Sequence, residues 1–270
     1  MNLKSTITLH TGREMPIIGL GTWQLTKDTP GTIQEALGLG YPMIDTSGDY
    51  GTQPGIGDGI QKSGFERSAF YLVTKVEEDD DAYEATKDDL AELGLSYADL
   101  MLLHRPPASG AGEDLWRGLM RARDDGLTKD IGVSNYSIEQ LQELIDNTGE
   151  VPVVNQIEWS PFGHSKEMLG YCQENGIVIQ AYSPLTRGER LDDQTVQEIA
   201  AAHGKTPGQI MIRWSLQQQG VVPIIKANSL DHLEENIKVF DFKLSEDDMR
   251  RLDSLNEEFS ALGSHQLSYN

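Results

Sequence analysis

The stretch FYLVTKVEEDDDAYEATKDDLAELGLSYADLMLLH, residues 70–104, contains the pattern that decides the fold. Two short apolar runs, at 70–75 and 99–104, flank an amphipathic segment at 79–94. Runs that are apolar at consecutive positions are typical of strands covered on both faces of a parallel sheet. The stretch therefore predicts a strand–helix–strand unit whose two strands end in polar residues, Lys75 and His104.

The same unit recurs along the chain. Six further apolar runs of strand length lie at 16–21, 41–45, 130–135, 153–158, 177–183 and 221–226. Helix-patterned segments separate the runs; one of them begins at Ser137 and ends before Gly149, which are common helix start and stop residues. Strands alternating with helices eight times predict an α/β protein, a (β/α)8 TIM barrel, in a single domain at 1–270.

Three segments depart from the plain repeat. Residues 6–16 have Thr-Gly between two short extended runs, which predicts an N-terminal β-hairpin that plugs the floor of the barrel. Between the last two strands there is room for two extra helices, at 192–203 and 206–219. A final helix is expected at 245–256, beginning at Ser245.

Composition limits the classes of function. The 43 Asp and Glu residues against 22 Lys and Arg give a formal net charge of −21. Such a surface repels nucleic acids and anionic membranes, so we expect neither as a partner; it fits ordinary solubility and a saline environment equally well. The single cysteine, Cys172, excludes an internal disulfide framework. The N-terminus lacks a signal-peptide core and no run has membrane-spanning length, so we expect a soluble cytoplasmic protein.

An acidic run at 77–92 stands out, and we interpret it as the solvated outer face of a helix, with acids near its N-terminus. The sequence nearby supplies neither histidines nor carboxylates from a second element for a metal site. One histidine among the strand ends also does not match a three-ligand zinc site, so we expect no metal.

Polar residues at the ends of the strands are the candidates for chemistry, because the carboxyl ends of parallel barrel strands share one face. They are Asp45 with Tyr50 in its loop, Lys75, His104, Ser134, Asn135, Asn155, Gln156, Tyr182, Ser183 and Lys226. An isomerase-type barrel would need a glutamate base late in the barrel; the nearest candidate, Glu158, is followed at once by a proline-containing corner.

Asp45, Lys75 and Tyr50 together suggest a phenol used as an acid. A tyrosine has an unperturbed pKa of about 10, which is high for proton transfer near neutral pH. A neighbouring ammonium stabilises the phenolate, so we expect Lys75 to lower the pKa of Tyr50. A lysine in a dry barrel mouth needs a carboxylate to stay charged, and Asp45 can provide it. His104, on the next strand, can orient a substrate oxygen.

Seven short motifs occur in order at these strand ends. They are GLGTW (19–23), IDTSGDYG (44–51), TK (74–75), LLH (102–104), IGVSNY (131–136), NQIEWSP (155–161) and AYSPL (181–185). In this order and register the chain resembles the aldo-keto reductases, over nearly its whole length. The resemblance implies a barrel without a Rossmann domain. PGIGDG at 54–59 is accordingly no dinucleotide fingerprint, since its glycines have the wrong spacing and precede a helix without a preceding strand.

The resemblance also implies an NADPH-dependent carbonyl reductase of the alcohol dehydrogenase type. In it Tyr50 protonates the substrate oxygen and His104 supplies a second hydrogen bond. The implied catalytic residues are Asp45, Tyr50, Lys75 and His104. The implied cofactor-binding residues are Thr22, Asp45, Ser134, Asn135, Gln156, Tyr182, Ser183, Leu185, Arg187, Lys226, Ala227, Asn228, His232, Glu235 and Asn236. The implied substrate-binding residues are Trp23, Tyr50, His104 and Arg105.

Departures from the family pattern qualify these expectations. Arg105 stands where many members have tryptophan after the catalytic histidine; it either favours acidic or very polar substrates or pairs with an acid in the loop. Ala227 and His232 replace a serine and an arginine often found near the cofactor 2′-phosphate. We therefore expect a modest preference for NADPH, with NADH as an alternative cofactor. The short tail at 255–270 predicts an open site and small substrates.

The leading hypothesis is thus a reductase of small carbonyl compounds, sugar-derived or dicarbonyl, that acts as a monomer. Two other classes remain. One is an NADP(H)-binding partner protein that senses redox state without catalysis, and the other is a different barrel enzyme such as an isomerase. Nucleotide binding and turnover distinguish the three.

Overall fold

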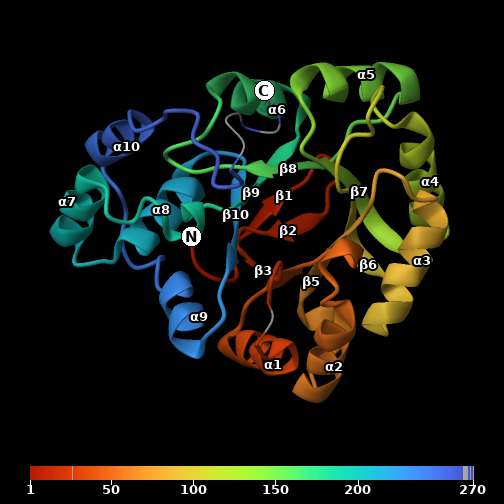
Figure 1. Cartoon of the computed structure of the whole chain (residues 1–270), viewed down its shortest axis with the longest axis horizontal. Helices are drawn as coiled ribbons and strands as arrows, with labels where there is room; N and C mark the ends of the chain where they lie inside the picture. Colours follow the sequence, from red (N-terminus) through yellow and green to blue (C-terminus); the bar gives the residue numbers. More distant parts are fainter. Residues whose placement is uncertain (26, 264–266, 268, 270) are drawn as a thin grey trace.

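The computed structural model describes residues 1–25, 27–263, 267 and 269. Eight parallel strands form a closed barrel, with the order β10-β3-β4-β5-β6-β7-β8-β9 (Figure 1). The strands are β3 (Gly19–Gly21), β4 (Met43–Asp45), β5 (Tyr71–Val76), β6 (Ala98–Leu103), β7 (Thr128–Ser134), β8 (Val154–Glu158), β9 (Val178–Tyr182) and β10 (Val221–Lys226). The predicted (β/α)8 barrel is confirmed.

The consecutive apolar positions of these strands are buried because both faces of the sheet are covered. All six residues of β6 are buried, for example. Alternate side chains point inward, where Met43, Val73, Leu100 and Leu102 form an interior cluster. The side chains between them point outward and pack against the helices. The barrel is therefore a filled core, and the space for ligands lies at its mouth.

Helices surround the barrel. They are α1 (Thr29–Leu39), α2 (Gln53–Ser63), α3 (Ala82–Leu93), α4 (Glu113–Asp124), α5 (Ile138–Thr148), α6 (Lys166–Asn175), α7 (Gln194–His203), α8 (Pro207–Gln217), α9 (Leu230–Ile237) and α10 (Glu246–Asp253). The expected extra helices are α7 and α8, and the final one is α10. Ser137 and Ser245 begin α5 and α10 with capping boxes, as their spacing to Gln140 and Asp248 allows.

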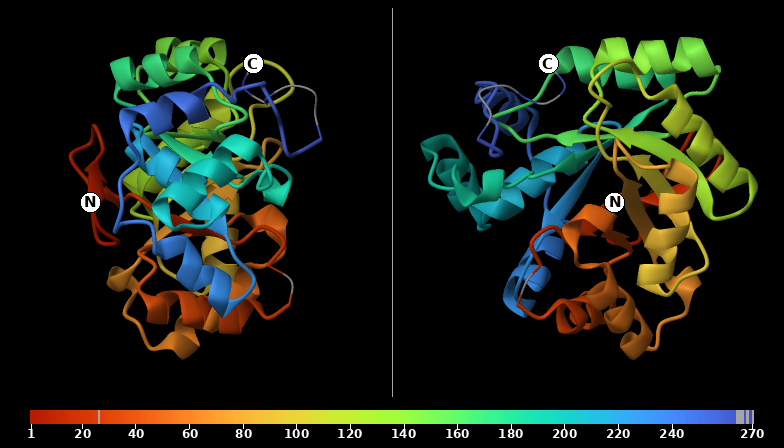
Figure 2. Two further views of the ribbon diagram at one scale, coloured as in Figure 1. Left: turned by 90° about the vertical axis from the view of Figure 1, so that its left-hand side faces the viewer. Right: turned by 45° about the vertical axis from the view of Figure 1, so that its right-hand side comes forward.

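The predicted hairpin consists of β1 (Thr6–Thr8) and β2 (Glu14–Pro16), which pair antiparallel. It lies across the end of the barrel opposite the C-terminal segment (Figure 2, left). Met15 is fully buried and joins the interior cluster. Arg13 donates to Asp130 at the start of β7 at 3.1 Å. The hairpin thus covers the floor of the barrel.

The glycine-rich segment at 54–59 lies within α2 itself, which corrects the expectation that its glycines precede a helix. A Cβ on Gly59 would lie 2.7 Å from the carbonyl oxygen of Pro30. Gly55 and Gly59 therefore let α1 and α2 approach closely. No helix in the described part of the chain has the length and apolarity needed to cross a lipid bilayer.

The acidic run at 77–92 is not wholly a solvated face, and our interpretation was wrong for two of its residues. Asp89 on α3 is buried, with 7 % of its surface exposed, and accepts a hydrogen bond from Thr74 at 3.2 Å. Glu77, directly after β5, turns toward the barrel mouth and contacts His104. Most other members of the run are exposed or half-exposed, as expected.

Candidate active site

The carboxyl ends of the strands surround a cavity of about 1300 Å³. Its lining includes every residue that the sequence predicted for the catalytic, cofactor and substrate sites, with the exception of Lys75. Lys75 lies directly behind the cavity wall, with its side chain fully buried. Residues that are up to two hundred positions apart in the chain thus meet at one site because the barrel aligns the ends of its strands.

Asp45, Lys75 and Tyr50 form a connected group. The Lys75 ammonium donates to both carboxylate oxygens of Asp45, at 2.9 and 3.0 Å, and to the carbonyl of Thr46 at 2.7 Å. It also donates to the Tyr50 hydroxyl at 3.4 Å. Tyr50 ends the short helix η1 (Gly48–Tyr50), which follows β4 and directs the phenol toward the cavity. The expected pairing of these three side chains is present.

The electrostatics of this group differ in one respect from the expectation. Burial would lower the pKa of Lys75, but Asp45 and Tyr50 outweigh it and raise the pKa, so the ammonium stays charged. Burial raises the pKa of Tyr50, and the Lys75 charge does not fully reverse this because Asp45 and Glu77 act in the opposite direction. The phenol is therefore fully protonated at neutral pH, the state that a proton donor requires.

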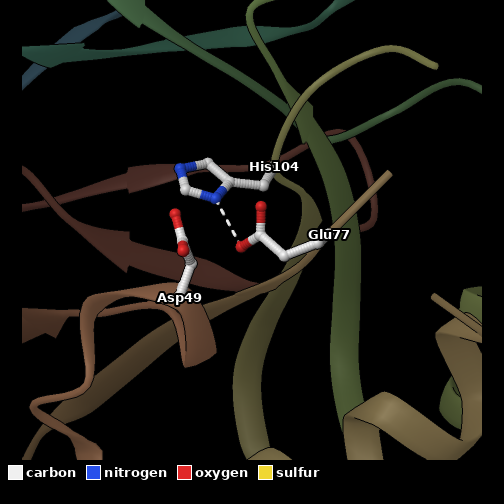
Figure 3. A group of neighbouring side chains, drawn as sticks. All are labelled: Asp49, Glu77 and His104. Atoms are coloured by element: carbon white, nitrogen blue, oxygen red, sulfur yellow. Dashed lines mark hydrogen bonds and ion pairs between the residues drawn. The ribbon is translucent and has the colours of Figure 1, made fainter. Parts of the chain in front are cut away.

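His104 follows β6 at the cavity wall, and its ring meets that of Tyr50 edge-on at 5.7 Å. Its Nδ1 atom lies 2.6 Å from Glu77, and the Ser47 hydroxyl donates to the same Glu77 oxygen at 3.0 Å (Figure 3). Glu77 was not among the site residues predicted from the sequence. The spacing could have indicated this position. Glu77 is two residues after Lys75, and residues two apart on an extended strand share a face.

Arg105 pairs with acids of the neighbouring loops. Its guanidinium lies 3.4 Å from Asp49, 3.6 Å from Glu77 and 3.6 Å from Glu78. The geometry agrees with the alternative in which Arg105 pairs with acids in the loop. The side chain also lines the cavity.

Asp49, Glu77 and His104 bring ligand atoms within 4.8 Å of one another, as Figure 3 shows. The sequence analysis placed no histidine near the acidic run, and the fold corrects that. The guanidinium of Arg105 lies against both carboxylates, however, and a second cation between them would be repelled. The group is best described as an ion-pair network beside the cavity.

The predicted nicotinamide residues lie on neighbouring strands opposite Tyr50. Ser134 donates to the carbonyl of Gln156 at 2.7 Å, and the Tyr182 hydroxyl donates to Asn135 at 2.8 Å. Gln156 donates to Asp45 at 2.7 Å, which links this wall to the Lys75 group. Asn135 and Ser183 adopt left-handed backbone conformations, with φ of 65° and 50°, which turn the chain at the cavity rim.

Two basic side chains, Lys226 and Arg187, line another part of the cavity, and the acids Glu189, Asp192 and Glu235 line the cavity as well. Burial and the charge of Arg187 lower the pKa of Lys226, which places two cations close together in a strongly acidic protein. The Arg187 guanidinium also lies 4.3 Å from the centre of the Trp23 ring. Trp23 lines the cavity and is 37 % exposed. The cavity is also lined by Ala227, Asn228, His232, Glu235 and Asn236.

Glu158 is held by the C-terminal segment. It accepts hydrogen bonds from the Ser260 hydroxyl at 2.6 Å and from the backbone amide of Ala261 at 2.7 Å. Leu262, from the same segment, lines the cavity. The carboxylate that an isomerase would have used as a base is thus engaged in anchoring the chain.

Comparison with known proteins agrees with this geometry. A model of the aldo/keto reductase family matches residues 17–257. The chain belongs to the aldo-keto reductase family. This aldo-keto reductase is 38% identical over 263 residues to a protein of Bacillus subtilis (strain 168) named glyoxal reductase, covering 95% of each chain. It is 40% identical over 270 residues to an aldo-keto reductase of Mycobacterium sp. (strain JLS), covering 98% of this chain and 97% of the other.

Solved structures of aldo-keto reductases superpose on this one. The enzyme from Brucella melitensis has a TM-score of 0.88 at 35% identity and covers 93% of this chain and 99% of its own. The enzyme from Bombyx mori, in complex with NADP, has a TM-score of 0.90 at 29% identity and covers 98% and 99%. The aldo-keto reductase described here is therefore an oxidoreductase.

Proposed function

We propose that this aldo-keto reductase reduces small aldehydes or ketones with NADPH, and that Tyr50 is the proton donor. The observation that carries the proposal is the contact between the Tyr50 hydroxyl and the Lys75 ammonium at 3.4 Å. The same ammonium donates to the Asp45 carboxylate at 2.9 Å. This contact lies at the wall of the large cavity, beside His104.

The residues present fit a phosphorylated dinucleotide. The cavity, about 1300 Å³, exceeds the ~300–1,000 Å³ typical of small-ligand pockets. Lys226 and Arg187 provide positive charge for phosphate groups, and Tyr182 offers an aromatic face. Ser134, Asn135 and Gln156 offer donors and acceptors for an amide. The NADP complex of the Bombyx mori relative supports the same cofactor here. When bound, NADPH supplies the hydride.

The protein's side chains have separate tasks. Tyr50 gives its proton to the substrate oxygen as negative charge develops there. Lys75, kept charged by Asp45, stabilises the phenolate that remains, because an ammonium beside a phenolate favours the ionised form. His104 places a hydrogen-bonding ring against the same oxygen. Asp45, Lys75 and His104 are buried, and Tyr50 is half-buried at the cavity wall, so a bound substrate would displace water from the site of proton transfer.

We propose dicarbonyl compounds of the size of glyoxal and methylglyoxal as substrates, with small sugar-derived carbonyls as a second group. The name of the Bacillus subtilis relative, glyoxal reductase, supports this class. Leu262 and Trp23 at the cavity rim add apolar surface at the entrance, which suits a compact substrate. Because Ala227 and His232 offer no guanidinium for the 2′-phosphate, we propose NADH as a weaker alternative cofactor.

Loss of NADPH absorbance on mixing with glyoxal, methylglyoxal, a nitrobenzaldehyde and a keto sugar tests this proposal. We expect turnover with at least the two dicarbonyls. Tight NADPH binding without turnover of any carbonyl would contradict the reductase and favour a redox-sensing partner protein. Failure to bind NADPH would contradict the cofactor as well.

A further inference from the structure

Glu77 lies in hydrogen-bond contact with the His104 ring, 2.6 Å from Nδ1. The residue extends from the end of β5, and its carboxylate lies between the Ser47 hydroxyl, the His104 ring and the Arg105 guanidinium. Three neighbouring strands, β4, β5 and β6, supply these groups, so the arrangement is held by the barrel itself.

The carboxylate of Glu77 is ionised at neutral pH. Burial opposes its ionisation, but the hydrogen bonds from His104 and Ser47 and the charges of His104 and Arg105 outweigh burial and lower the pKa of Glu77. An ionised carboxylate only accepts hydrogen bonds. At a separation of 2.6 Å, the proton between the two groups must therefore belong to Nδ1 of His104.

This assignment restricts what the rest of the ring can do. With Nδ1 protonated, a neutral imidazole has a lone pair on Nε2 and can only accept a hydrogen bond there. Nε2 points away from Glu77 (Figure 3). A carbonyl substrate also presents only lone pairs. His104 can therefore donate to a substrate oxygen only when both of its nitrogens carry protons.

Resting on the function proposed above, we infer that Glu77 is a positioning residue that holds His104 in its doubly protonated form during carbonyl reduction. The Glu77 carboxylate both orients the ring and neutralises its charge. In reduction, bound NADPH would supply a hydride to the carbonyl carbon. Tyr50 would give its proton to the oxygen and remain as a phenolate beside Lys75, while His104 would donate a hydrogen bond without releasing its proton.

Other charges face His104 and set the background. They are Asp45 on β4, Asp49 and Tyr50 on η1, Lys75 on β5, and Arg105 and Glu78 in the adjoining loops. Lys75 is neutralised by Asp45 at 2.9 Å, and Arg105 is shared among three carboxylates. Glu77 is the acid in hydrogen-bond contact with the ring, so its removal has the largest effect.

The test uses protein labelled with ¹⁵N in its histidine rings and followed by NMR from pH 5 to 9. The His104 signals are assigned by their loss in His104→Gln. In the wild type, we expect the ¹⁵N chemical shifts of the neutral His104 ring to be those of the tautomer with its proton on Nδ1. Observation of the opposite tautomer, with the proton on Nε2, would overturn the inference without recourse to any variant.

Glu77→Gln separates charge from orientation, because the amide oxygen can still accept from Nδ1. We expect its His104 transition to move to lower pH by about one unit or more. The falling limb of kcat/KM for reduction should move with it, giving about a tenfold loss at pH 7.5. Glu78→Gln is the matched control: it removes the same charge beside Arg105, and both transitions should stay in place.

The two proposals fail separately in this experiment. An unchanged His104 transition in Glu77→Gln, in an enzyme that still turns over, would overturn the role of Glu77 alone. Absence of turnover in the wild type would overturn the proposed reductase function, while the NMR titration would still decide whether Glu77 controls the ring.

Discussion

The two carboxylate oxygens of Asp45 lie 2.9 and 3.0 Å from the ammonium of Lys75, and both side chains are almost completely buried. A buried ion pair gives little net stability, but removing one partner leaves an uncompensated charge. The Lys75 ammonium also contacts the Tyr50 hydroxyl at 3.4 Å. Changes to the Asp45–Lys75 pair should therefore affect both the stability of the barrel mouth and the surroundings of the proposed proton donor.

Asp45→Asn should lower the free energy of unfolding by about 3–5 kcal/mol, because it leaves the Lys75 ammonium buried without its counter-charge. Urea unfolding near pH 7 measures this loss. The pKa of Lys75 is raised, so the stabilisation by Asp45 is complete below pH 10.5 and is lost as the pH rises through the raised pKa. The double variant Asp45→Leu with Lys75→Met should recover most of the stability but none of the turnover. Equal stability loss in both variants would show that the pair is not the cause.

Asp89 should make the protein less stable as the pH rises. It lies buried on α3, and burial raises its pKa from 3.8 to about 7. The folded state therefore binds this proton more tightly than the unfolded state, and stability falls between pH 3.8 and about 7. From pH 5 to pH 8 the loss from this one group is about 2–3 kcal/mol.

Asp89→Asn removes that loss, so the variant should be more stable than the wild type by a clearly larger margin at pH 8 than at pH 4.5. Urea unfolding at the two pH values measures the difference. Asp88→Asn is the control, since Asp88 is the exposed neighbour on the same helix. A pH dependence that persists unchanged in Asp89→Asn would contradict the assignment.

Lys226 should discriminate between the two nicotinamide cofactors. Lys226→Met removes a charge facing the cavity, so the Kd for NADPH should rise about tenfold while that for NADH changes less than about twofold. Fluorescence titration of the bound cofactors measures both constants. Lys243→Met removes an exposed lysine that does not line the cavity and should leave both unchanged. An equal loss of affinity for NADPH and NADH would show that Lys226 does not contact the 2′-phosphate.

The fold could be predicted from the sequence because each strand is a short, fully apolar run and each helix carries its own start and stop residues. Asp45, Lys75 and His104 could be placed together for the same reason, since each directly ends a run. The extra helices α7 and α8 followed from the length of the connection between β9 and β10.

The balance of charges at the site could not be predicted, because it depends on distances and burial that no run of residues encodes. Lys75 alone suggested a lowered pKa for Tyr50, yet burial and two carboxylates raise it. The burial of Asp89 was not predicted, because the residue stands in an acidic run. Its spacing to Ala82, Thr86 and Leu93 is nevertheless that of the buried face of a helix. Glu77 was missed for the same reason, since a run of acids suggests solvent.

The most direct measurement compares turnover and cofactor binding in Tyr50→Phe and in the wild type. We predict that kcat for methylglyoxal reduction falls by about 10²–10⁴-fold, while the Kd for NADPH stays within about twofold, because only the proton donor is lost. Tyr83→Phe, the same change on the outer face of α3, should leave both values unaltered. Turnover that survives in Tyr50→Phe would contradict the central claim that this phenol is the acid.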